Sequence, residues 1–584
     1  MSTPVLTYHD GTKHYFHRFA RSLGYLDWAS QPNPFRSFAG AAEYALHPRP
    51  DAAGSALQAA QSGLRPFESL RVVPSNVEGR GPQAALSLSK GAIHTPVSAI
   101  EIGDILRHSL GLSAWKEFRE SRWSLRVNPS SGNLHPTEAY VVAGPLAGVS
   151  DALSVYHYAP DRHALEQRCA FDPAAWTAAI AGNEGAWLIA LTSIHWREAW
   201  KYGERAFRYC QHDLGHAIAA VRIAAELAGR RARMLPDWSH RDIAALTGID
   251  RDEDYVEAER EEPGCVLVVT SHQSSVVSRQ SAVDSQQSAV VDRAALLEAV
   301  RQGQWTGRAN QLSEEHVQWT FIDEIALATR DPGRARPSTG SGRASDPPPL
   351  TLSLSKGEAA YTRSLLLQRR SAVSFDGRGS IDAARCFAML SAVMPREDPP
   401  WDALWWDAKI HFILFVHRVN GLDPGIYLLA RHPSAPDRLR AACGREFLWD
   451  PAHESLPLFA LARGDCRSLA QRVSCDQAIA GDGFFSLGMI ADFDASLETF
   501  GPAFYRHLFW ESGVVGQVLY LEAEAAGTRG TGIGCFYDDP VHDVLGLTGH
   551  AFQSLYHFTI GTPVEDTRLS TEPGYPWEKN SGLA

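Results

Sequence analysis

Two stretches of this chain of 584 residues repeat one pattern, and the repeat limits the possible folds more than any other feature. The first stretch, AFRYCQHDLGHAIAAVRIAAELAG, ends at Gly229, and the second, FYRHLFWESGVVGQVLYLEAEAAG, ends at Gly527. Both carry an arginine, an acidic residue and a glycine at the same spacing: Arg208, Asp213 and Gly215 in the first, and Arg506, Glu511 and Gly513 in the second. The repeat predicts two similar domains within one chain.

Further patterns flank both stretches in the same order. AGNEGAWLIALT, from Ala181, precedes the first stretch, and AGDGFFSLGMIA, from Ala480, precedes the second. DIAALTG, from Asp242, follows the first stretch, and DVLGLTG, from Asp543, follows the second. We expect a duplicated domain in one chain to behave as a covalent dimer with unequal halves.

Length and composition fit large domains and exclude several classes of protein. The net charge is −12, and no basic block is interleaved with aromatic residues, so we expect no nucleic-acid partner. The start of the chain lacks an apolar signal segment, and no run of about 18 apolar residues occurs, so we expect no membrane span. The eight cysteines form no CxxC motif, which predicts reduced thiols, a cytoplasmic location and no metal site.

The alternation of short apolar runs with long proline-free stretches predicts an α+β fold, in which long helices cover the strands. We expect strands at 139–144, 187–194, 265–270, 410–417 and 485–491. We expect long helices at 204–228 and 503–526, each closed by a glycine. Ser313 is the expected N-cap of a further helix that links the halves.

The predicted domains are an N-terminal extension with an inserted loop (1–95), a first domain (96–270), a linking region (271–357) and a second domain with a C-terminal tail (358–584). Three segments rich in Gly, Ser, Pro or Gln interrupt this plan: residues 69–91, 271–291 and 334–357. Because their composition predicts loops without periodic structure, we expect them to carry no chemistry.

Two segments suit the binding of a polar or anionic ligand. NPSSGNLHP, from Asn128, predicts a tight loop with small side chains and free backbone N–H groups, which suits a flat polar ligand. LLLQRRSAVSFDG places Arg369, Arg370 and Ser371 together, and two guanidiniums with a hydroxyl suit a phosphate. Taken alone, both segments are more typical of an ordinary turn or a solvated helix end.

Two other segments suit proton transfer and close backbone approach. WREAWKYGERAFRY carries Lys201 and Tyr202 at the start of a long helix, where lysine and tyrosine side chains can deliver or accept protons. GTRGTGIGCF, from Gly527, has four glycines that let the backbone approach a ligand. It follows a helix, so it does not fit a dinucleotide-binding fingerprint. Taken alone, the Lys–Tyr pair is more typical of a helix start with solvent-exposed side chains.

Together these four segments resemble the nitroreductase-like flavoproteins, and most closely their azoline dehydrogenase branch, the SagB/ThcOx type. The resemblance covers most of the chain outside the three interrupting segments. It implies two tandem domains, each with a central mixed or antiparallel sheet flanked by long helices, that form an intrachain pseudo-dimer. Family members are dimers that bind flavin mononucleotide (FMN) at the subunit interface.

The resemblance also implies a role for each candidate residue. It assigns Arg369, Arg370 and Ser371 to the FMN phosphate and ribityl chain. It assigns Pro129, Ser130, Ser131 and Asn133 to the flavin ring. It assigns backbone groups of Gly532, Ile533 and Gly534 to the neighbourhood of the flavin. It assigns the proton chemistry to Lys201 and Tyr202.

The chain departs from the family pattern in ways that distinguish its halves. In the family, a basic residue usually stands two positions after the serine of the phosphate-binding Arg-x-Ser motif, and here that position is Val373. The first half has no clear Arg-x-Ser motif, and the second has AVMPREDPP in place of the PSSGN loop and Thr499–Phe500 in place of the Lys–Tyr pair. We therefore expect a pseudo-dimer with one intact FMN site and one decayed site.

The leading functional prediction is an FMN-dependent dehydrogenase of the SagB/ThcOx type, acting on a small molecule or a modified peptide. Two alternatives remain open. One is a nitro or quinone reductase that uses NAD(P)H, because the flavin serves either direction. The other is a flavin-free member of the family that acts as a binding or scaffold subunit.

Overall fold

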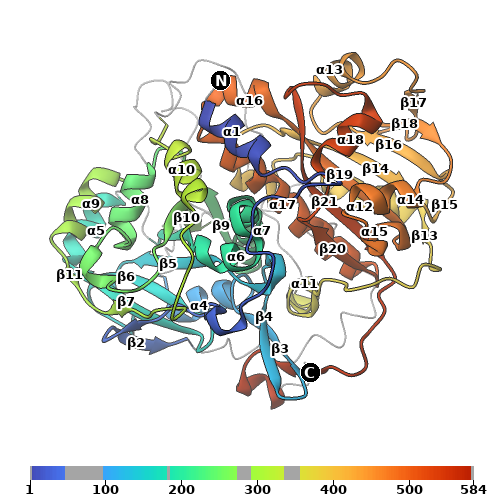
Figure 1. Cartoon of the computed structure of the whole chain (residues 1–584). Coiled ribbons are helices and arrows are strands. Elements are labelled where there is room, and N and C mark those ends of the chain that lie inside the picture. The colour runs from blue at the N-terminus through green and yellow to red at the C-terminus, as the bar shows by residue number, and fades with distance from the viewer. Residues whose placement is uncertain (1–2, 47–96, 181–184, 272–290, 335–355, 581–584) are drawn as a thin grey trace, which may run out of the picture.

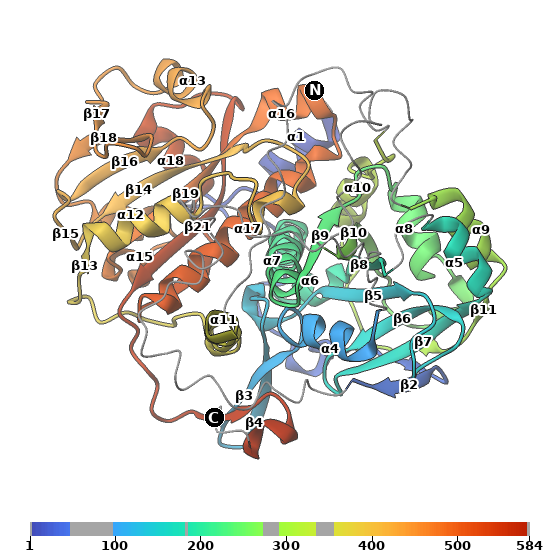
Figure 2. The ribbon, with the colours of Figure 1, turned by 180° about the vertical axis from the view of Figure 1, so that it is seen from behind.

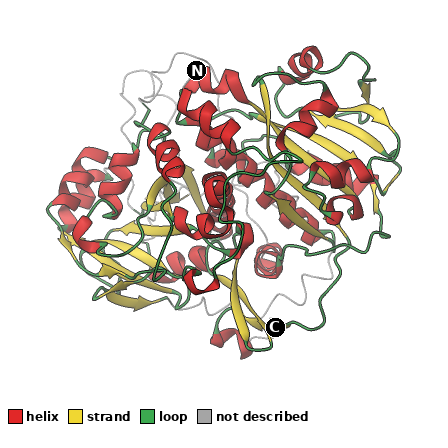
Figure 3. Cartoon of the chain, in the orientation of Figure 1, coloured by secondary structure: helices red, strands yellow, loops and turns green. Residues whose placement is uncertain are grey.

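The chain forms two α+β halves around a pair of central helices (Figures 1 and 3). The computed structural model describes residues 3–46, 97–180, 185–271, 291–334 and 356–580. Segment 69–91 and nearly all of segments 271–291 and 334–357 lie outside these residues. Among the described residues, no helix combines the length and the apolar character that a membrane crossing requires.

Each half contains one large antiparallel sheet, and the two sheets share a strand order. The first sheet has the order β11–β7–β6–β5–β8–β10–β9, with β2 paired to β7, and the second has the order β17–β18–β16–β14–β19–β21–β20. The central pairs correspond: Val141 lies opposite Ile189 in the first sheet, and Phe412 opposite Met489 in the second. Both central pairs are formed by fully buried strands, as the continuous apolar runs predict.

The first sheet is built from β2 (Ala42–Ala45), β5 (Thr137–Ala143), β6 (Leu153–Ala159), β7 (Ala164–Phe171), β8 (Trp187–Ser193), β9 (Arg230–Met234), β10 (Glu262–Ser271) and β11 (Gln304–Trp305). The second is built from β14 (Ile410–Val416), β16 (Gly425–Leu429), β17 (Asp450–Pro451), β18 (Leu458–Arg463), β19 (Phe485–Asp492), β20 (Arg529–Ile533) and β21 (Phe552–Gly561). All five strands predicted from the apolar runs are therefore confirmed.

Each sheet has one face covered by short helices and one face turned to a core that spans both halves. The short helices on the first sheet are α5 (Pro173–Ala179), α8 (His240–Thr247) and α9 (Arg293–Arg301), and those on the second are α13 (Ala435–Ala442), α14 (Arg467–Val473) and α18 (Asp538–Leu545). The shared core includes side chains such as Val141, Leu214, Phe412 and Val514. One continuous apolar core explains why the halves form a single unit.

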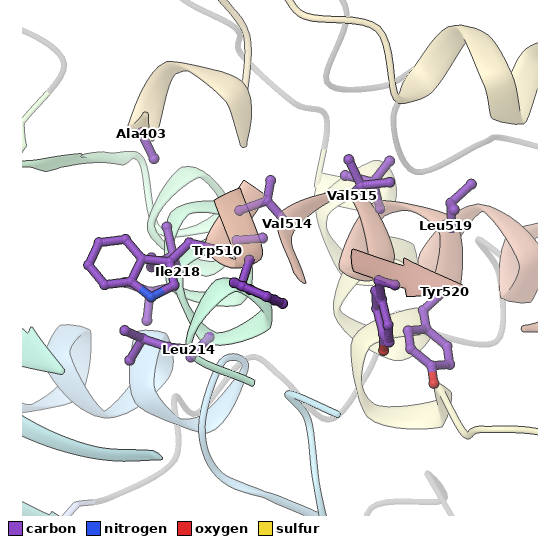
Figure 4. Packing of buried hydrophobic residues seen from close by; sticks show 14 of the residues in the cluster. Leu214, Ile218, Ala403, Trp510, Val514, Val515, Leu519 and Tyr520 are labelled. Atoms are coloured by element: carbon purple, nitrogen blue, oxygen red, sulfur yellow. The ribbon is translucent and has the colours of Figure 1, made fainter. Parts of the chain in front are cut away.

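The two predicted long helices are confirmed and pack against each other between the sheets (Figures 2 and 4). They are α7 (Ala206–Leu227), in which every residue is buried, and α17 (Phe504–Ala525). A Cβ atom at Gly215 would meet the backbone carbonyl of Trp510, and one at Gly513 would meet that of His212. The contact is reciprocal, because Trp510 and His212 are themselves aligned in the repeat, and reciprocal contacts are the mark of a two-fold arrangement.

The structure corrects the alignment of one flanking pattern. Helix α8 ends at Gly248 and α18 ends at Gly546, both in the left-handed conformation that glycine tolerates best. The shared letters LTG align Gly248 with Gly549, whereas the ends of the two helices pair Gly248 with Gly546, about one helical turn earlier. The spacing along the chain agrees, since α8 follows α6 (His195–Tyr202) at the same distance as α18 follows α16 (Phe493–Phe500).

The predicted helix cap at Ser313 is wrong. The helix is α10 (Thr320–Ala328), which starts after Trp319, and the Ser313 hydroxyl instead donates to Ser30 O over 2.9 Å and accepts from Trp196 Nε1 over 2.8 Å. These tertiary partners compete for the side chain that local sequence would assign to a cap.

Helix α10 is the counterpart of the first helix, α1 (Thr3–Gly11). Arg208 Nε donates to Thr12 Oγ1 over 3.0 Å just after α1, and Arg506 Nε donates to Thr329 Oγ1 over 2.9 Å just after α10. The two arginines are aligned in the repeat, so the repeated unit begins earlier than the sequence patterns indicated.

Both ends of the chain lie against the opposite half. Helix α1 packs beside α16, where His9 Nε2 lies 2.9 Å from Gln553 Oε1 (Figure 1). The C-terminal strand β22 (Ser570–Pro573) pairs with β3 (Leu112–Phe118), which pairs with β4 (Ser121–Arg126). The remaining elements are α4 (Ala99–Arg107), α11 (Lys356–Gln368), α12 (Ala383–Ala392), α15 (Ala478–Asp482), and the short pairs β1 (Phe38–Ala39) with β12 (Arg308–Ala309) and β13 (Ile381–Asp382) with β15 (Val419–Asn420).

Candidate functional site

A cavity of about 1570 Å³ lies between the two halves and brings the predicted site residues together. Its lining includes every predicted cofactor-binding residue: Pro129, Ser130, Ser131 and Asn133 from the first half, and Arg369, Arg370, Ser371, Gly532, Ile533 and Gly534 from the second. Tyr202 also lines it. Lys201 does not, but its Nζ lies 3.1 Å from the position a Cβ atom would take at Gly132, in the wall of the cavity.

Arg369 lies directly after α11 and is buried against the first half. Its Nε donates to Val127 O and its Nη2 to Arg126 O, both over 3.1 Å. Its Nη1 is buried without a hydrogen-bond partner among the described residues, and burial lowers the pKa of the guanidinium. A buried charged donor without a partner is costly, so the site is suited to an anion that accepts from Nη1.

Arg370 and Ser371 complete the basic end of the cavity. Arg370 donates to Ser113 Oγ over 3.3 Å, and burial together with the charge of Arg369 lowers its pKa to about 10. The Ser371 hydroxyl lies 2.9 Å from Tyr520 OH. Val373 is 89% exposed. Two guanidiniums this close favour a bound phosphate that neutralises both.

The loop assigned to the flavin ring, the ring loop, forms a 3-10 turn at Ser131–Asn133 and is anchored to helix α7. The backbone N–H of Ser131 donates to the Asp213 carboxylate over 3.1 Å, and the Ser131 hydroxyl does the same over 3.1 Å. Asn133 donates from Nδ2 to Ser124 O over 2.9 Å. Gly132 has φ 60°, which explains the glycine at the tip of the loop. The loop is therefore rigid. The free backbone N–H groups expected here are instead used, by Asp213 at Ser131 and by Ser130 at Asn133 and His135.

The glycines of the TGIGCF segment make room for aromatic rings. A Cβ atom at Gly532 would collide with the Tyr556 hydroxyl, and one at Gly534 with the Tyr209 ring. The Gly532 N–H is already used, because it donates to Tyr520 OH over 2.8 Å. The close approach expected here is thus made by tyrosines that themselves line the cavity.

A pair of buried carboxyl groups lies beneath the ring loop, and sequence reasoning missed its role. Glu198 is fully buried, and its carboxyl group lies against Asp213 and Ser130. Burial, followed by the charge of Asp213, raises the pKa of Glu198 well above its usual value. Burial raises the pKa of Asp213 to about 7.

This carboxyl pair stands beside the predicted catalytic residues. Glu198 precedes Lys201 by one turn of α6, so the two side chains share a helix face. This spacing could have indicated from the sequence that Glu198 lies near the catalytic residues. The Lys201 Nζ lies 5.3 Å from the centre of the Tyr202 ring, and this ring is 4.2 Å from that of Tyr209. The group combines a lysine amine, a phenol and two carboxyls whose pKa values are raised by burial.

The corresponding location in the second half is filled with side chains. Phe500 and His507 stand at the positions aligned with Tyr202 and Tyr209, and they pack with Trp405. Trp406, 6% exposed, lies 4.9 Å from His507 between ring centres. Aromatic packing therefore takes the place of the two tyrosines of the first half.

The acidic residue of the second half is also neutralised. Glu511, the counterpart of Asp213, is paired with Arg431 and accepts from the backbone N–H groups of Lys409 and Ile410. Asp213 has no arginine partner among the described residues. The two halves therefore differ in charge as well as in shape at this position.

Similarity to known proteins agrees with this architecture. No protein-family model matches the chain. A candidate nitroreductase of Methanocaldococcus jannaschii is 26% identical over 141 residues, which cover 23% of this chain and 66% of that protein, just under two thirds of its length. The crystal structure of a candidate nitroreductase from Anabaena variabilis has a TM-score of 0.63 and 18% identity, over 97% of this chain and 100% of that one.

The fold is nitroreductase-like. The predicted α+β fold of two such halves in one chain is therefore confirmed. A chain of the Escherichia coli microcin synthetase complex McbBCD also matches, with 15% identity over 44% of this chain and 85% of that one. Its TM-score of 0.26 is too low to bear on function.

Proposed function

We propose that this protein is an FMN-dependent oxidoreductase with one flavin site between its halves. The observation that carries the proposal is the buried, unpartnered Nη1 of Arg369 in a cavity whose other wall is the rigid Ser131–Asn133 loop. Arg369, Arg370 and Ser371 would hold the phosphate end, and the loop would support the ring. Bound FMN would supply a two-electron acceptor.

The asymmetry of the halves supports a single site. The ring loop comes from the first half, and the basic grip (Arg369, Arg370 and Ser371) comes from the second. At the equivalent location, where the halves would exchange these roles, the second half has the aromatic cluster of Trp405, Trp406, Phe500 and His507. We infer that one unit was duplicated and that only one of the two resulting sites was kept.

Within this class we propose a dehydrogenase of the SagB/ThcOx type. Taking a hydride from a carbon requires a base for the proton on a neighbouring atom, and Lys201, with Tyr202 beside it, stands at the ring loop. Of the two buried carboxyls, Asp213, with a pKa of about 7, can take up a proton released from Lys201, whereas Glu198 already holds its own. A cavity larger than the roughly 300–1000 Å³ of a typical small-molecule site leaves room for a small-molecule or modified-peptide substrate beside the cofactor.

Titration of the purified protein with FMN tests the main proposal. We expect one FMN to bind per chain, as measured by the quenching of flavin fluorescence. Arg369→Ala should bind FMN at least about tenfold more weakly, since a hydrogen bond to a charged group contributes about 1.5–3 kcal/mol. Arg378→Ala, in an exposed loop, is the matched control and should bind FMN normally. Two equivalent sites, or a colourless protein that ignores FMN, would contradict the proposal and favour a scaffold role.

Anaerobic mixing with NADPH separates the two enzymatic alternatives. A dehydrogenase driven by its own substrate should show no rapid bleaching of the flavin, whereas a nitro or quinone reductase should bleach at once.

Lys201→Ala should keep FMN bound and slow substrate oxidation by about 100-fold or more, the usual contribution of a positioned acid or base. Full activity in Lys201→Ala on the true substrate would refute its assignment as the base.

A further inference from the structure

Two cysteines stand apart from the rest of the chain. Six of the eight are buried, whereas Cys475 and Cys535 are partly exposed. Their Sγ atoms lie 3.1 Å apart, about one ångström more than the length of a disulfide bond of about 2.05 Å. Cys535 directly follows Gly534 and lines the cavity, so the pair stands in the wall of the proposed flavin site.

Hydrogen bonds hold the two cysteine segments together. Gln477 Nε2 donates to Cys535 O over 2.8 Å and to Ser474 O over 2.9 Å. The Tyr537 N–H donates to Val473 O over 2.9 Å. Because these bonds join the backbones on both sides of the sulfur atoms, closing a bond between the sulfurs requires little movement of the chain.

The backbone at Cys475 is also unusual. Cys475 has φ 55° and Asp476 has φ 57°, which puts two consecutive residues other than glycine in the left-handed region. Each such residue costs on the order of 1 kcal/mol or more, and such outliers gather at functional sites. The strained turn places the Cys475 sulfur against Cys535.

The charged surroundings distinguish the two sulfurs. His14 Nδ1 lies 3.7 Å from Cys535 Sγ, and Arg205 and Asp538 are the neighbouring charges. The hydrogen bond shared with Cys475, followed by that from His14, lowers the pKa of Cys535, whereas the pKa of Cys475 is raised. Cys535 is thus the thiolate and Cys475 the thiol of the pair, the arrangement found where one sulfur attacks and the other resolves.

We propose that Cys475 and Cys535 are a redox-active dithiol that is oxidised to a disulfide by low-molecular-weight disulfides. The Cys535 thiolate attacks one sulfur of the reagent, forms a mixed disulfide and releases one thiolate. Cys475 then loses its proton to solvent and attacks Cys535 Sγ, which releases the second thiolate. In total, two protein thiols and one disulfide yield one protein disulfide and two free thiols.

This chemistry does not require the flavin, so it stands or falls independently of the proposed function. A bond between the two sulfurs would draw the segment after Gly534 towards α14 at the wall of the cavity. Oxidation or reduction of the pair would therefore alter the wall of the cavity that the ring loop and the glycine segment both line.

Oxidised glutathione added to the reduced, folded protein tests the proposal. We expect the intact mass to fall by two hydrogens, with no glutathione retained and a Cys475–Cys535 cross-link in the peptide map. Cys475→Ser should instead retain one glutathione on Cys535, and Cys535→Ser should not react. Cys386→Ser, which removes a buried thiol, should behave like the natural protein.

The rate gives a second readout, which is independent of the variants. Because the pKa of Cys535 is lowered, the rate of its attack should rise less steeply with pH between about 6 and 8 than that of an ordinary thiol, which reacts roughly tenfold faster per pH unit in that range. A stable mixed disulfide in the natural protein would overturn the proposal. So would one equivalent of bound zinc that blocks the reaction until a chelator removes it, because His14, Cys475 and Cys535 would then be metal ligands.

Discussion

At the scale of single residues, the site is defined by buried ionisable groups. Arg369 presents a donor without a partner among the described residues, and Asp213 lies between the ring loop and the buried acid Glu198. Groups held in this way are costly for folding, and proteins keep them where function needs them. The second half shows the alternative, since Glu511 is neutralised by Arg431.

Asp213 predicts a specific dependence of stability on pH. Burial raises its pKa to about 7 in the folded protein, so the folded state binds a proton that the unfolded carboxyl has lost above about pH 4. The free energy of unfolding should therefore fall as the pH rises from about 4 to about 7 and then level off. Asp213→Asn, whose amide oxygen still accepts from Ser131, should remove this loss.

Urea unfolding at about pH 5 and about pH 8 measures the effect. Asp213→Asn should be more stable than the natural protein at the higher pH by a few kcal/mol, at about 1.4 kcal/mol per unit of pKa shift, and by less at the lower pH. Asp543→Asn, the same change at an exposed carboxyl, should show no difference between the two pH values. An equal effect of Asp213→Asn at both would mean that its pKa is not raised.

At the scale of elements, helices α7 and α17 determine how the halves meet. Their close approach requires that Gly215 and Gly513 carry no side chain, because the atoms that each glycine faces are backbone atoms that cannot rotate away. The pairing of two helices through small residues fixes one register, since sliding either helix would bring a side chain against the other backbone.

Gly215→Ala should therefore destabilise the protein by about 3 kcal/mol or more, the upper end of what overpacking costs, because the added methyl group meets the Trp510 carbonyl. Gly229→Ala is the control: open space surrounds it, and only its left-handed φ of 73° is penalised, by about 1–2 kcal/mol. Thermal or urea unfolding compares the two. Equal losses would show that the helices move apart at little cost.

At the scale of the whole molecule, each half completes the other. Helix α1 packs on the second half, strand β22 extends a sheet of the first, and the shared core joins both. A cavity assembled from both halves follows from this exchange, because neither half alone contains both the ring loop and the basic grip.

Splitting the chain tests this interdependence. Chains 1–345 and 346–584, produced together, should copurify and bind FMN jointly, since the apolar faces of α7 and α17 drive their association. Each produced alone should be insoluble or unfolded by circular dichroism, because it exposes half of the shared core. A soluble, folded half that binds FMN by itself would show that the site does not depend on both halves.

The repeat, the α+β class, the five core strands, the two long helices and the segments that line the cavity could all be predicted from the sequence. These features depend on local spacing, such as the apolar periodicity of strands and the turn chemistry of the PSSGN loop. The misplaced cap at Ser313 marks the limit of local reasoning, because distant partners at Ser30 and Trp196 take that side chain.

Which residues come into contact could be learned only from the three-dimensional structure. It brought Glu198 to Asp213, set Cys475 against Cys535 and filled the second location with aromatic rings. It also showed that α10 repeats α1. These contacts join segments that lie far apart along the chain or on separate helices, and they depend on how the elements pack, which local spacing does not encode.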